Sequence, residues 1–250
     1  MICDGTPANR EGEPDMRFTI LKSGTIRTWR HLLSGETVTP ERIEVPVPFF
    51  AIEHKGHLIL FDCGQQMPEM PVAETADYIP VMTAEDALPR QLEQHGLSAE
   101  KVSHLILSHA HGDHCGGLAE LGNITCLIQR QEIETPAGKK LISAFPEKKW
   151  QILDGETDLF HDGRIVAVPT PGHTPGHQSL LLTLDDGMRI CLAADALYMD
   201  RALDDDREMR FTSREAVEYF RRLRKDGVHV ISGHDPASFE YNQRRFCRQR

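Results

Sequence analysis

The 250-residue chain has no apolar run that approaches the roughly 20 residues a membrane-spanning helix needs. Its beginning, MICDGTPANREGEPDM, has neither the basic segment nor the apolar segment of a secretory signal. We therefore expect no membrane association, and a location in the cytoplasm. Patterning typical of folded structure begins at Met16, so residues 1–15 are predicted to form a mobile N-terminal tail.

Positive charge and paired cysteines are also scarce. The 28 Lys and Arg residues against 38 Asp and Glu residues give a formal net charge of −10, which repels phosphate backbones and argues against a nucleic-acid partner. The six cysteines have no CxxC spacing, and three of them lie in apolar runs. We therefore expect reduced, buried thiols and no disulfide framework.

Strand-like and helix-like segments alternate to the end of the chain, which predicts a layered α/β fold. The length fits one domain over residues 16–250. Several apolar runs are continuous, as in strands that are buried on both faces. The predicted strands are FTILKSG, VPFFAIEH, HLILFDCG, VSHLILSH, ITCLIQRQ, RIVAVPT, HQSLLLTL, MRICLAAD and VHVISGHD.

Two helices have clear end signals. The first is predicted to begin after Thr83, which pairs with Asp86 in a capping box, and to end at Gly96, with a kink or early stop at Pro89. The segment before it, residues 65–82, contains prolines and no regular period, so we expect a long loop that is either a functional lid or disordered.

The second helix is predicted to begin at Thr212, with Glu215 completing a capping box, and to end at Gly227. Its apolar face is expected to contain Val217, Phe220 and Leu223.

The stretch SHAHGDHCGG places strongly hydrated side chains directly after an apolar strand. Alternate residues of an extended segment face one side, so His109 and His111 can bind one metal ion together. Asp113 and His114 follow the bend at Gly112 and can face a second ion. Imidazole and carboxylate groups lose hydration when buried, and a metal supplies the partners that they need.

Three further donors follow other apolar runs: His173 in PGHTPGH, Asp195 in LAADALY and His234 in ISGHD. If Asp195 is shared, each of two divalent ions has three other protein ligands and room for water. Zinc is the first expectation, with manganese, iron or cobalt as alternatives. The seven predicted metal ligands are His109, His111, Asp113, His114, His173, Asp195 and His234.

The pattern HxHxDH, followed by an isolated GH, an Asp and a second GH, resembles the metallo-β-lactamase superfamily. The resemblance implies an αβ/βα sandwich, with two mixed β-sheets flanked by helices and a dinuclear site at one edge. It also implies that Asp62 of FDCG orients a ligand histidine. For His104 and His177, which lie close to the motifs, a supporting role is weighed against a purely structural one.

Within the superfamily, the blocks YIPVM, TPGHTPGHQSLLL, DALY and SGHD are similar to N-acyl-homoserine lactonases. The resemblance implies a small-molecule lactone as substrate and quorum quenching as the function; a homodimer is one expected assembly. Hydrolysis of 4-pyridoxolactone, γ-butyrolactone or a thioester is an alternative. A non-hydrolytic metal-binding protein or an iron redox protein is the competing class.

The lactonase resemblance also implies catalytic roles. A hydroxide held between the ions would attack the lactone carbonyl, Tyr198 would donate a hydrogen bond to the developing charge, and Asp113 would relay a proton to the leaving alkoxide. One position departs from the pattern, because Gly112 replaces an aromatic residue that lines the acyl pocket in some lactonases. The residues weighed as other apolar contacts are Met67, Met70, Phe49 and Phe50, with core packing favoured for the two phenylalanines.

Overall fold

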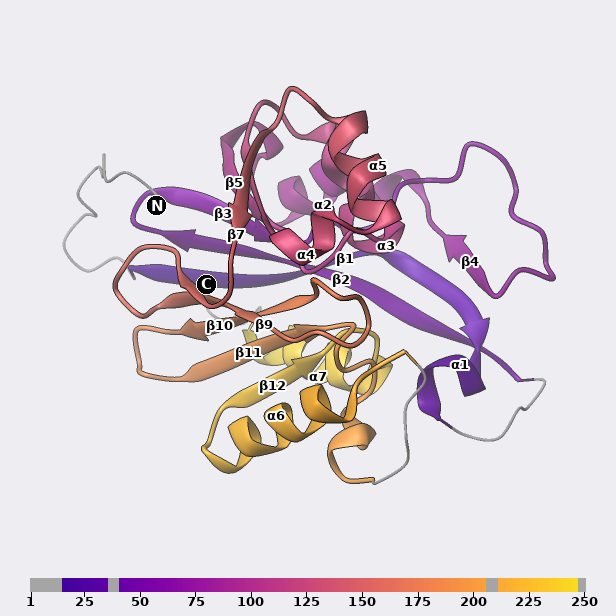
Figure 1. Ribbon diagram of the computed structural model, residues 1–250. Coiled ribbons are helices and arrows are strands. Elements are labelled where there is room, and N and C mark those ends of the chain that lie inside the picture. The colour runs from indigo at the N-terminus through magenta and orange to yellow at the C-terminus, as the bar shows by residue number, and fades with distance from the viewer. Residues whose placement is uncertain (1–14, 36–40, 206–210, 247–250) are drawn as a thin grey trace.

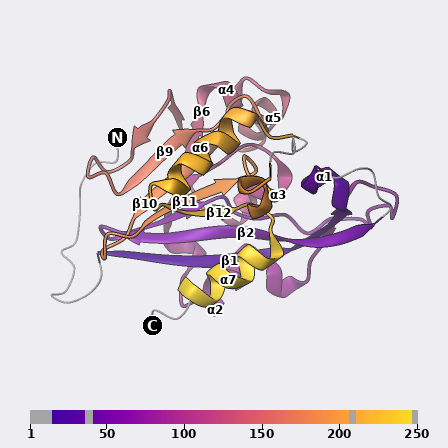
Figure 2. The ribbon, with the colours of Figure 1, turned by 90° about the horizontal axis from the view of Figure 1, so that it is seen from below.

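The computed structural model describes residues 15–35, 41–205 and 211–246. Two mixed β-sheets pack face to face, and helices cover their outer faces (Figure 1). Figure 2 shows α6 running across the five-stranded sheet, and α7 lying beside β1 and β2. The predicted αβ/βα sandwich is therefore confirmed.

The larger sheet has the strand order β4-β1-β2-β3-β5-β6-β7, with the β3, β5, β6 and β7 neighbours parallel. Its strands are β1 (Met16–Trp29), β2 (Arg42–His54), β3 (His57–Phe61), β4 (Tyr78–Val81), β5 (Val102–Ile106), β6 (Thr125–Gln129) and β7 (Lys149–Leu153).

The smaller sheet has the order β12-β11-β10-β9-β8, and only β11 and β12 are parallel. Its strands are β8 (Thr157–Asp158), β9 (Ile165–Pro169), β10 (Gln178–Thr183), β11 (Arg189–Ala194) and β12 (His229–Ser232). All nine predicted strands are present, whereas β4, β7 and β8 were not predicted.

The α-helices are α1 (Arg30–Ser34), α2 (Leu88–Gln94), α3 (Gly112–Cys115), α4 (Arg130–Ile133), α5 (Pro136–Ala144), α6 (Arg214–Lys225) and α7 (Pro236–Phe246). Short 3-10 turns occur at Ala84–Asp86, Ala99–Lys101, Gly116–Glu120 and Asp200–Leu203. Within the described ranges, no helix has both the length and the apolar character needed to cross a bilayer.

The continuous apolar run in β2 serves two cores at once. Phe50 and Ile52 face the other sheet, while Phe49 and Ala51 face the layer that contains α2 and α5. Side chains alternate between the faces of a strand, so a strand with helices on one side and a sheet on the other is apolar throughout. A third core joins the outer face of the smaller sheet to Phe220 and other residues of α6.

The predicted helix after Thr83 is divided in two. The capping box between Thr83 and Asp86 is present, but it begins a 3-10 turn, and α2 then starts separately at Leu88. Pro89 lies in the first turn of α2, so of the two predicted effects the kink is wrong, whereas the helix is shortened, to Leu88–Gln94. The physical reason is that the first-turn amide has no acceptor within the helix, so proline costs little there.

The second helix is confirmed with a different N-terminal cap. Ser213, not Thr212, is the capping residue of α6, because its Oγ accepts a hydrogen bond from Ala216 N at 3.1 Å. Ala216, Phe220 and Leu223 are buried, whereas Val217 is only partly buried.

The segment at residues 65–82 is not loop throughout, since β4 pairs with β1 along the edge of the larger sheet. Of the predicted tail, residues 1–14 lie outside the described residues. Asp15 is described, and its Oδ2 lies 2.7 Å from Arg164 Nη1. The boundary between a tail and a domain at residue 16 stays a prediction.

Four cysteines are described, and all are buried free thiols: Cys63, Cys115, Cys126 and Cys191. For these four the predicted burial is confirmed, and the reduced state stays a prediction; Cys3 and Cys247 lie outside the described residues. Burial raises the pKa of Cys115, which adjoins the histidine cluster, to about 12. A thiol with that pKa is protonated at neutral pH and is a weak nucleophile.

The cap of α6 can be tested by stability measurements. Replacing Ser213 with Ala removes the acceptor for Ala216 N, and we expect the free energy of unfolding to fall by about 1 kcal/mol. Thr is also a good capping residue and keeps the hydroxyl that donates to Pro171 O at 2.9 Å, so Ser213→Thr should keep most of the stability. Urea unfolding of both variants would check this, and equal losses would show that the cap contributes nothing.

Candidate metal centre

The predicted site residues lie at the ends of strands that meet at one edge of the sandwich. The segment from His109 to His114 follows β5 of the larger sheet, His173 follows β9, Asp195 follows β11 and His234 follows β12. The polar residues that follow strands of both sheets therefore lie at the same place. The structure brings all seven predicted ligands together there, in two groups.

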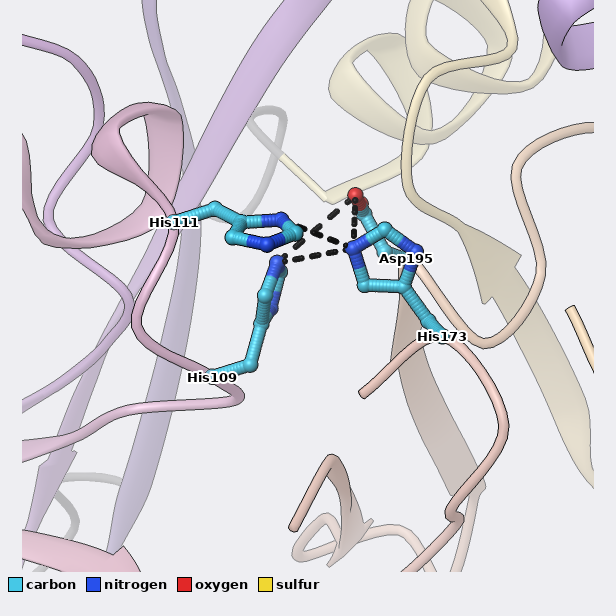
Figure 3. A group of neighbouring side chains, drawn as sticks. All are labelled: His109, His111, His173 and Asp195. Carbon is cyan, nitrogen blue, oxygen red and sulfur yellow. Dashed lines mark hydrogen bonds and ion pairs between the residues drawn. The ribbon is translucent and has the colours of Figure 1, made fainter. Parts of the chain in front are cut away.

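The first group contains His109, His111, His173 and Asp195, whose rings and carboxylate point toward one another (Figure 3). His173 Nε2 lies 2.9 Å from His111 Nδ1 and 3.1 Å from His109 Nε2. It also lies 3.3 Å from Asp195 Oδ2. The figure shows one pair of histidines approaching from the loop after β5 and the other two side chains from the smaller sheet.

The second group contains Asp113, His114, Asp195 and His234. Asp195 Oδ1 lies 3.0 Å from both His114 Nε2 and His234 Nε2. Asp113 Oδ2 lies 3.6 Å from each of the same two nitrogens. Asp195 thus turns one oxygen toward each group.

The charges of the first group suit a cation that binds neutral imidazoles. Burial, together with the neighbouring His114, lowers the pKa of His109 well below its ordinary value. Burial also lowers the pKa of His173. Neutral imidazole nitrogens carry the lone pairs that a metal ion needs.

The second group has an excess of negative charge. Burial alone would lower the pKa of His114, but Asp195, Asp113 and Asp62 together raise it well above its ordinary value. Burial alone would raise the pKa of Asp195, but His114, His234 and His173 hold it well below its usual range. Three carboxylates around buried histidines therefore require positive charge, supplied either by protons or by a metal ion.

Two buried atoms show that a metal fits. Within the part of the chain that the structure describes, His114 Nε2 and Asp195 Oδ1 have no hydrogen-bond partner, although they face each other at 3.0 Å. Buried polar atoms without partners are costly and rare. A divalent cation between such donors would satisfy both, so the residues present fit a divalent metal site.

Asp62 holds one of the histidines from behind, as the superfamily resemblance implies. Its Oδ2 accepts hydrogen bonds from His114 Nδ1 at 2.8 Å and Ser108 Oγ at 2.8 Å, and its Oδ1 accepts from Ser108 N at 2.7 Å. The hydrogen bond fixes the tautomer that leaves His114 Nε2 facing Asp195. Similarly, His234 Nδ1 donates to Pro46 O at 2.8 Å.

Tyr198 lies at the same site, as the lactonase resemblance implies. Its hydroxyl is 2.9 Å from His173 Nδ1, which also lies 3.1 Å from Phe211 O. Burial, followed by the Asp195 carboxylate, raises the pKa of the Tyr198 hydroxyl far above its ordinary value. The group therefore remains protonated and able to donate a hydrogen bond.

Five of the seven donors, His111, Asp113, His173, Asp195 and His234, line a cavity of about 850 Å³ with a mostly apolar wall. One part of that wall comes from β1, β2 and α1, and another from α5. The apolar wall residues include Ile26, Leu33, Val45, Ala137, Leu141, Ala144 and Phe145. Gly112 also lines the cavity, and a Cβ placed on it would meet no atom within 4 Å. The missing side chain leaves this part of the cavity open.

Other candidate contacts lie elsewhere. Met67 and Met70 are exposed and are not among the described residues that line the cavity. Phe49 and Phe50 are core residues, in agreement with the favoured prediction.

The two extra histidines differ from each other. His177 is buried, and its ring lies 5.2 Å from that of His109, which places it directly behind the first group. His104 lies against Ser103 and His57 instead, with 2.8 Å between Ser103 Oγ and His104 Nδ1. A supporting role is therefore open to His177, whereas His104 is a structural residue.

Glu132 in α4 was missed by sequence reasoning. It is fully buried and accepts hydrogen bonds from Ala110 N and Thr174 Oγ1, in the two loops that contain His109 and His173. The sequence EIET around it carries no motif. Only a buried acidic residue shortly after an apolar strand could have drawn notice.

A family model described as "Metallo-beta-lactamase superfamily" matches residues 42–234 of the chain. The chain belongs to the metallo-β-lactamase superfamily. All seven candidate donors lie within the matched range.

Two curated relatives are named as N-acyl homoserine lactonases. The chain is 32% identical over 248 residues to the N-acyl homoserine lactonase AttM of Azorhizobium caulinodans, covering 89% of this chain and 94% of that protein. It is 30% identical over 223 residues to an N-acyl homoserine lactonase of a Bacillus species, covering 82% and 88%.

A solved structure of an N-acyl homoserine lactone hydrolase, with the product N-hexanoyl-L-homoserine at its catalytic metal centre, shares the fold. The TM-score is 0.76 at 22% identity, with 90% of this chain and 95% of that chain covered.

The support that Asp62 gives to the second group can be tested with zinc. Asn can adopt the positive φ of 58° found at Asp62, but its amide cannot accept every hydrogen bond that the carboxylate accepts. We expect Asp62→Asn to weaken zinc binding by about 10- to 100-fold. A competition titration with a chromophoric chelator would measure this.

The matched control is Asp162→Asn, which makes the same change at a carboxylate that accepts from His54 Nε2 at 2.8 Å, far from the site. Equal zinc affinities in the two variants would contradict the role of Asp62.

Proposed function

We propose that the chain is a metal-dependent hydrolase that opens the lactone ring of N-acyl homoserine lactones. The observation that carries the proposal is the pair of donor groups that share Asp195 and line a mostly apolar cavity. The activity for which the similar proteins are named supports the choice of substrate.

In this proposal two divalent ions are bound, one in each donor group, with Asp195 shared. Imidazole and carboxylate donors suit zinc, while manganese, iron and cobalt accept the same donors. When bound, such ions supply Lewis acidity, which makes water a stronger nucleophile near neutral pH and polarises a carbonyl oxygen. The ligands would be His109, His111 and His173 for one ion and Asp113, His114 and His234 for the other.

Tyr198 would act as a hydrogen-bond donor. A carbonyl oxygen can only accept, so the Nδ1–H of His173 donates to Phe211 O, and Nε2 remains a lone-pair donor for the first group. The Tyr198 hydroxyl then keeps its own proton for the substrate. Directed at the lactone carbonyl or ring oxygen, it would stabilise the negative charge that develops there.

Asp113 would serve in proton transfer as well as in binding. Its side chain is 22% exposed and lines the cavity, whereas the Asp195 side chain is only 5% exposed. A carboxylate at the cavity surface can accept the proton that the attacking water loses and pass it to the ring oxygen as the C–O bond breaks. The product is a hydroxy acid.

The apolar wall gives the acyl chain a place to bind. Gly112 lines the same cavity as Leu141 of α5 and Phe145, the residue that follows α5, so an acyl chain bound there would contact apolar side chains. Each buried methylene group would contribute about 0.8 kcal/mol to binding. A small lactone without a chain would leave this surface unused.

Acid release in a pH-stat tests the proposal. Zinc- or manganese-loaded protein would be compared on acyl-homoserine lactones of short and long chain, γ-butyrolactone, 4-pyridoxolactone, a glutathione thioester and a β-lactam. Fast release from the acyl-homoserine lactones alone is expected. Activity on another ester only would contradict the substrate, and no activity on any of them would favour the metal-binding or iron redox class.

Loss of the Tyr198 hydroxyl should slow turnover and leave the metals bound. We expect Tyr198→Phe to lower kcat by roughly 10- to 1000-fold, the range for losing one such donor. Elemental analysis should still find the wild-type metal content, because His173 keeps its hydrogen bond to Phe211 O. Unchanged kcat would remove Tyr198 from the mechanism.

Filling the space at Gly112 should change chain-length preference. A Phe side chain there has free space to enter, and we expect Gly112→Phe to lower kcat/KM for long-chain substrates by about tenfold or more while short chains change little. The matched control is Gly122→Phe, at another glycine whose added Cβ meets no atom but which does not line the cavity. The same loss for all chain lengths would place the acyl group elsewhere.

Two finer expectations stay predictions: the homodimer and the location in the cytoplasm. The first can be measured by sedimentation of the full chain, and the second by fractionation of cells that produce it.

A further inference from the structure

Glu132 is a fully buried carboxylate that no part of the proposed mechanism uses. It lies in α4, the short helix that follows β6. Buried carboxylates are rare and are retained where their oxygens have specific partners. The partners of Glu132 lie in two different loops of the candidate metal centre.

One oxygen is bound by each loop. Ala110 N donates to Glu132 Oε1 at 3.0 Å, and Ala110 lies between His109 and His111. Thr174 Oγ1 donates to Oε2 at 2.6 Å, and Thr174 directly follows His173. Because both oxygens of a carboxylate accept, the two loops do not compete for the same atom.

The backbone of Glu132 also packs closely against the neighbouring loop and helix. A Cβ on Gly176, in the loop after His173, would lie 2.0 Å from Glu132 N, and a Cβ on Gly138 would lie 2.1 Å from Glu132 O. Thr135 Oγ1 also donates to Glu132 O at 2.7 Å. The start of α4 is therefore fixed against the His173 loop and against α5, and Glu132 cannot move independently of them.

The two loops come from different sheets. The loop with His109 and His111 follows β5 of the larger sheet, and the loop with His173 joins β9 to β10 of the smaller one. The separation of His111 from His173 thus depends on how the sheets are held at this point. The contacts of Asp62 and Pro46 hold His114 and His234, which belong to the second group.

We propose that Glu132 is a positioning residue that sets the distance between the His109–His111 pair and His173, and so the affinity of the first metal ion only. The inference rests on the proposed two-metal centre. It assigns the two groups separate supports, with Glu132 behind the first and Asp62 behind the second.

Zinc titration without any lactone tests the inference. We expect Glu132→Ala and Thr174→Val to lower the affinity for one of the two zinc ions by about 10- to 100-fold and to leave the affinity for the other unchanged. Thr174→Ser keeps the hydroxyl and should bind both ions normally. Glu132→Gln should also bind nearly normally, because its oxygen can accept from Ala110 N and its amide can donate to Thr174 Oγ1.

Single-site backgrounds identify the ion that is affected. In the His234→Ala variant, which retains the first group, adding Thr174→Val should lower the affinity for the remaining zinc ion. In the His111→Ala variant, which retains the second group, Thr174→Val should not change the zinc affinity, while Asp62→Asn should lower it. A residue that affects only overall stability would weaken binding of the single remaining ion in both backgrounds.

The outcomes separate this inference from the proposed function. Equal weakening of both ions, or no weakening in Glu132→Ala and Thr174→Val, overturns the role of Glu132 alone. Wild-type protein that binds no zinc, or a single ion, overturns the two-metal centre and this inference with it. If the protein binds two zinc ions and the variants affect only the first, but no lactone is hydrolysed, the role of Glu132 holds and the proposed substrate is wrong.

Discussion

The carboxylate of Asp195 is the contact on which the site depends, because its two oxygens face two different sets of histidines. The backbone at the end of β11 places the Asp195 carboxylate between the two sets. Ala194 has a φ of 45°, and the pairing of β11 with β12 shifts register there, which turns Asp195 out of the sheet. A Cβ on Gly233 would lie 2.7 Å from Ala194 O, so the residue before His234 must be small for the two strand ends to come this close.

Polar side chains also hold the sheets together beside the site. Gln178 at the start of β10 donates from its backbone to Ser108 O at 2.9 Å and from its side chain to Leu107 O at 2.7 Å. Gln129 of β6 donates in turn to Gln178 Oε1 at 2.9 Å. Buried amides of this kind are stable only when each group has a partner, and so they fix one arrangement of the sheets. Asp195 needs that fixed arrangement to face both donor groups.

The parts that could be predicted from the sequence are those with a local signal. Apolar runs that end in His109, His173 or His234 indicate both a strand and the edge at which it ends. Pro89 was misjudged because its effect depends on where α2 begins, which the capping signal at Thr83 did not reveal. Glu132 could not be predicted, because its role depends on contacts with Ala110 and Thr174 that only the folded sheets create.

The order of the donors along the chain has a consequence for folding. The first donors follow β5 and the last follows β12, so the site assembles only after both sheets have formed and packed. Closing such long loops costs entropy before any contact between the groups can repay it. In an unfolded chain no preformed site exists, so part of the free energy of metal binding would act as free energy of folding. An ion at this edge would join the N-terminal and C-terminal halves of the chain much as a covalent cross-link does.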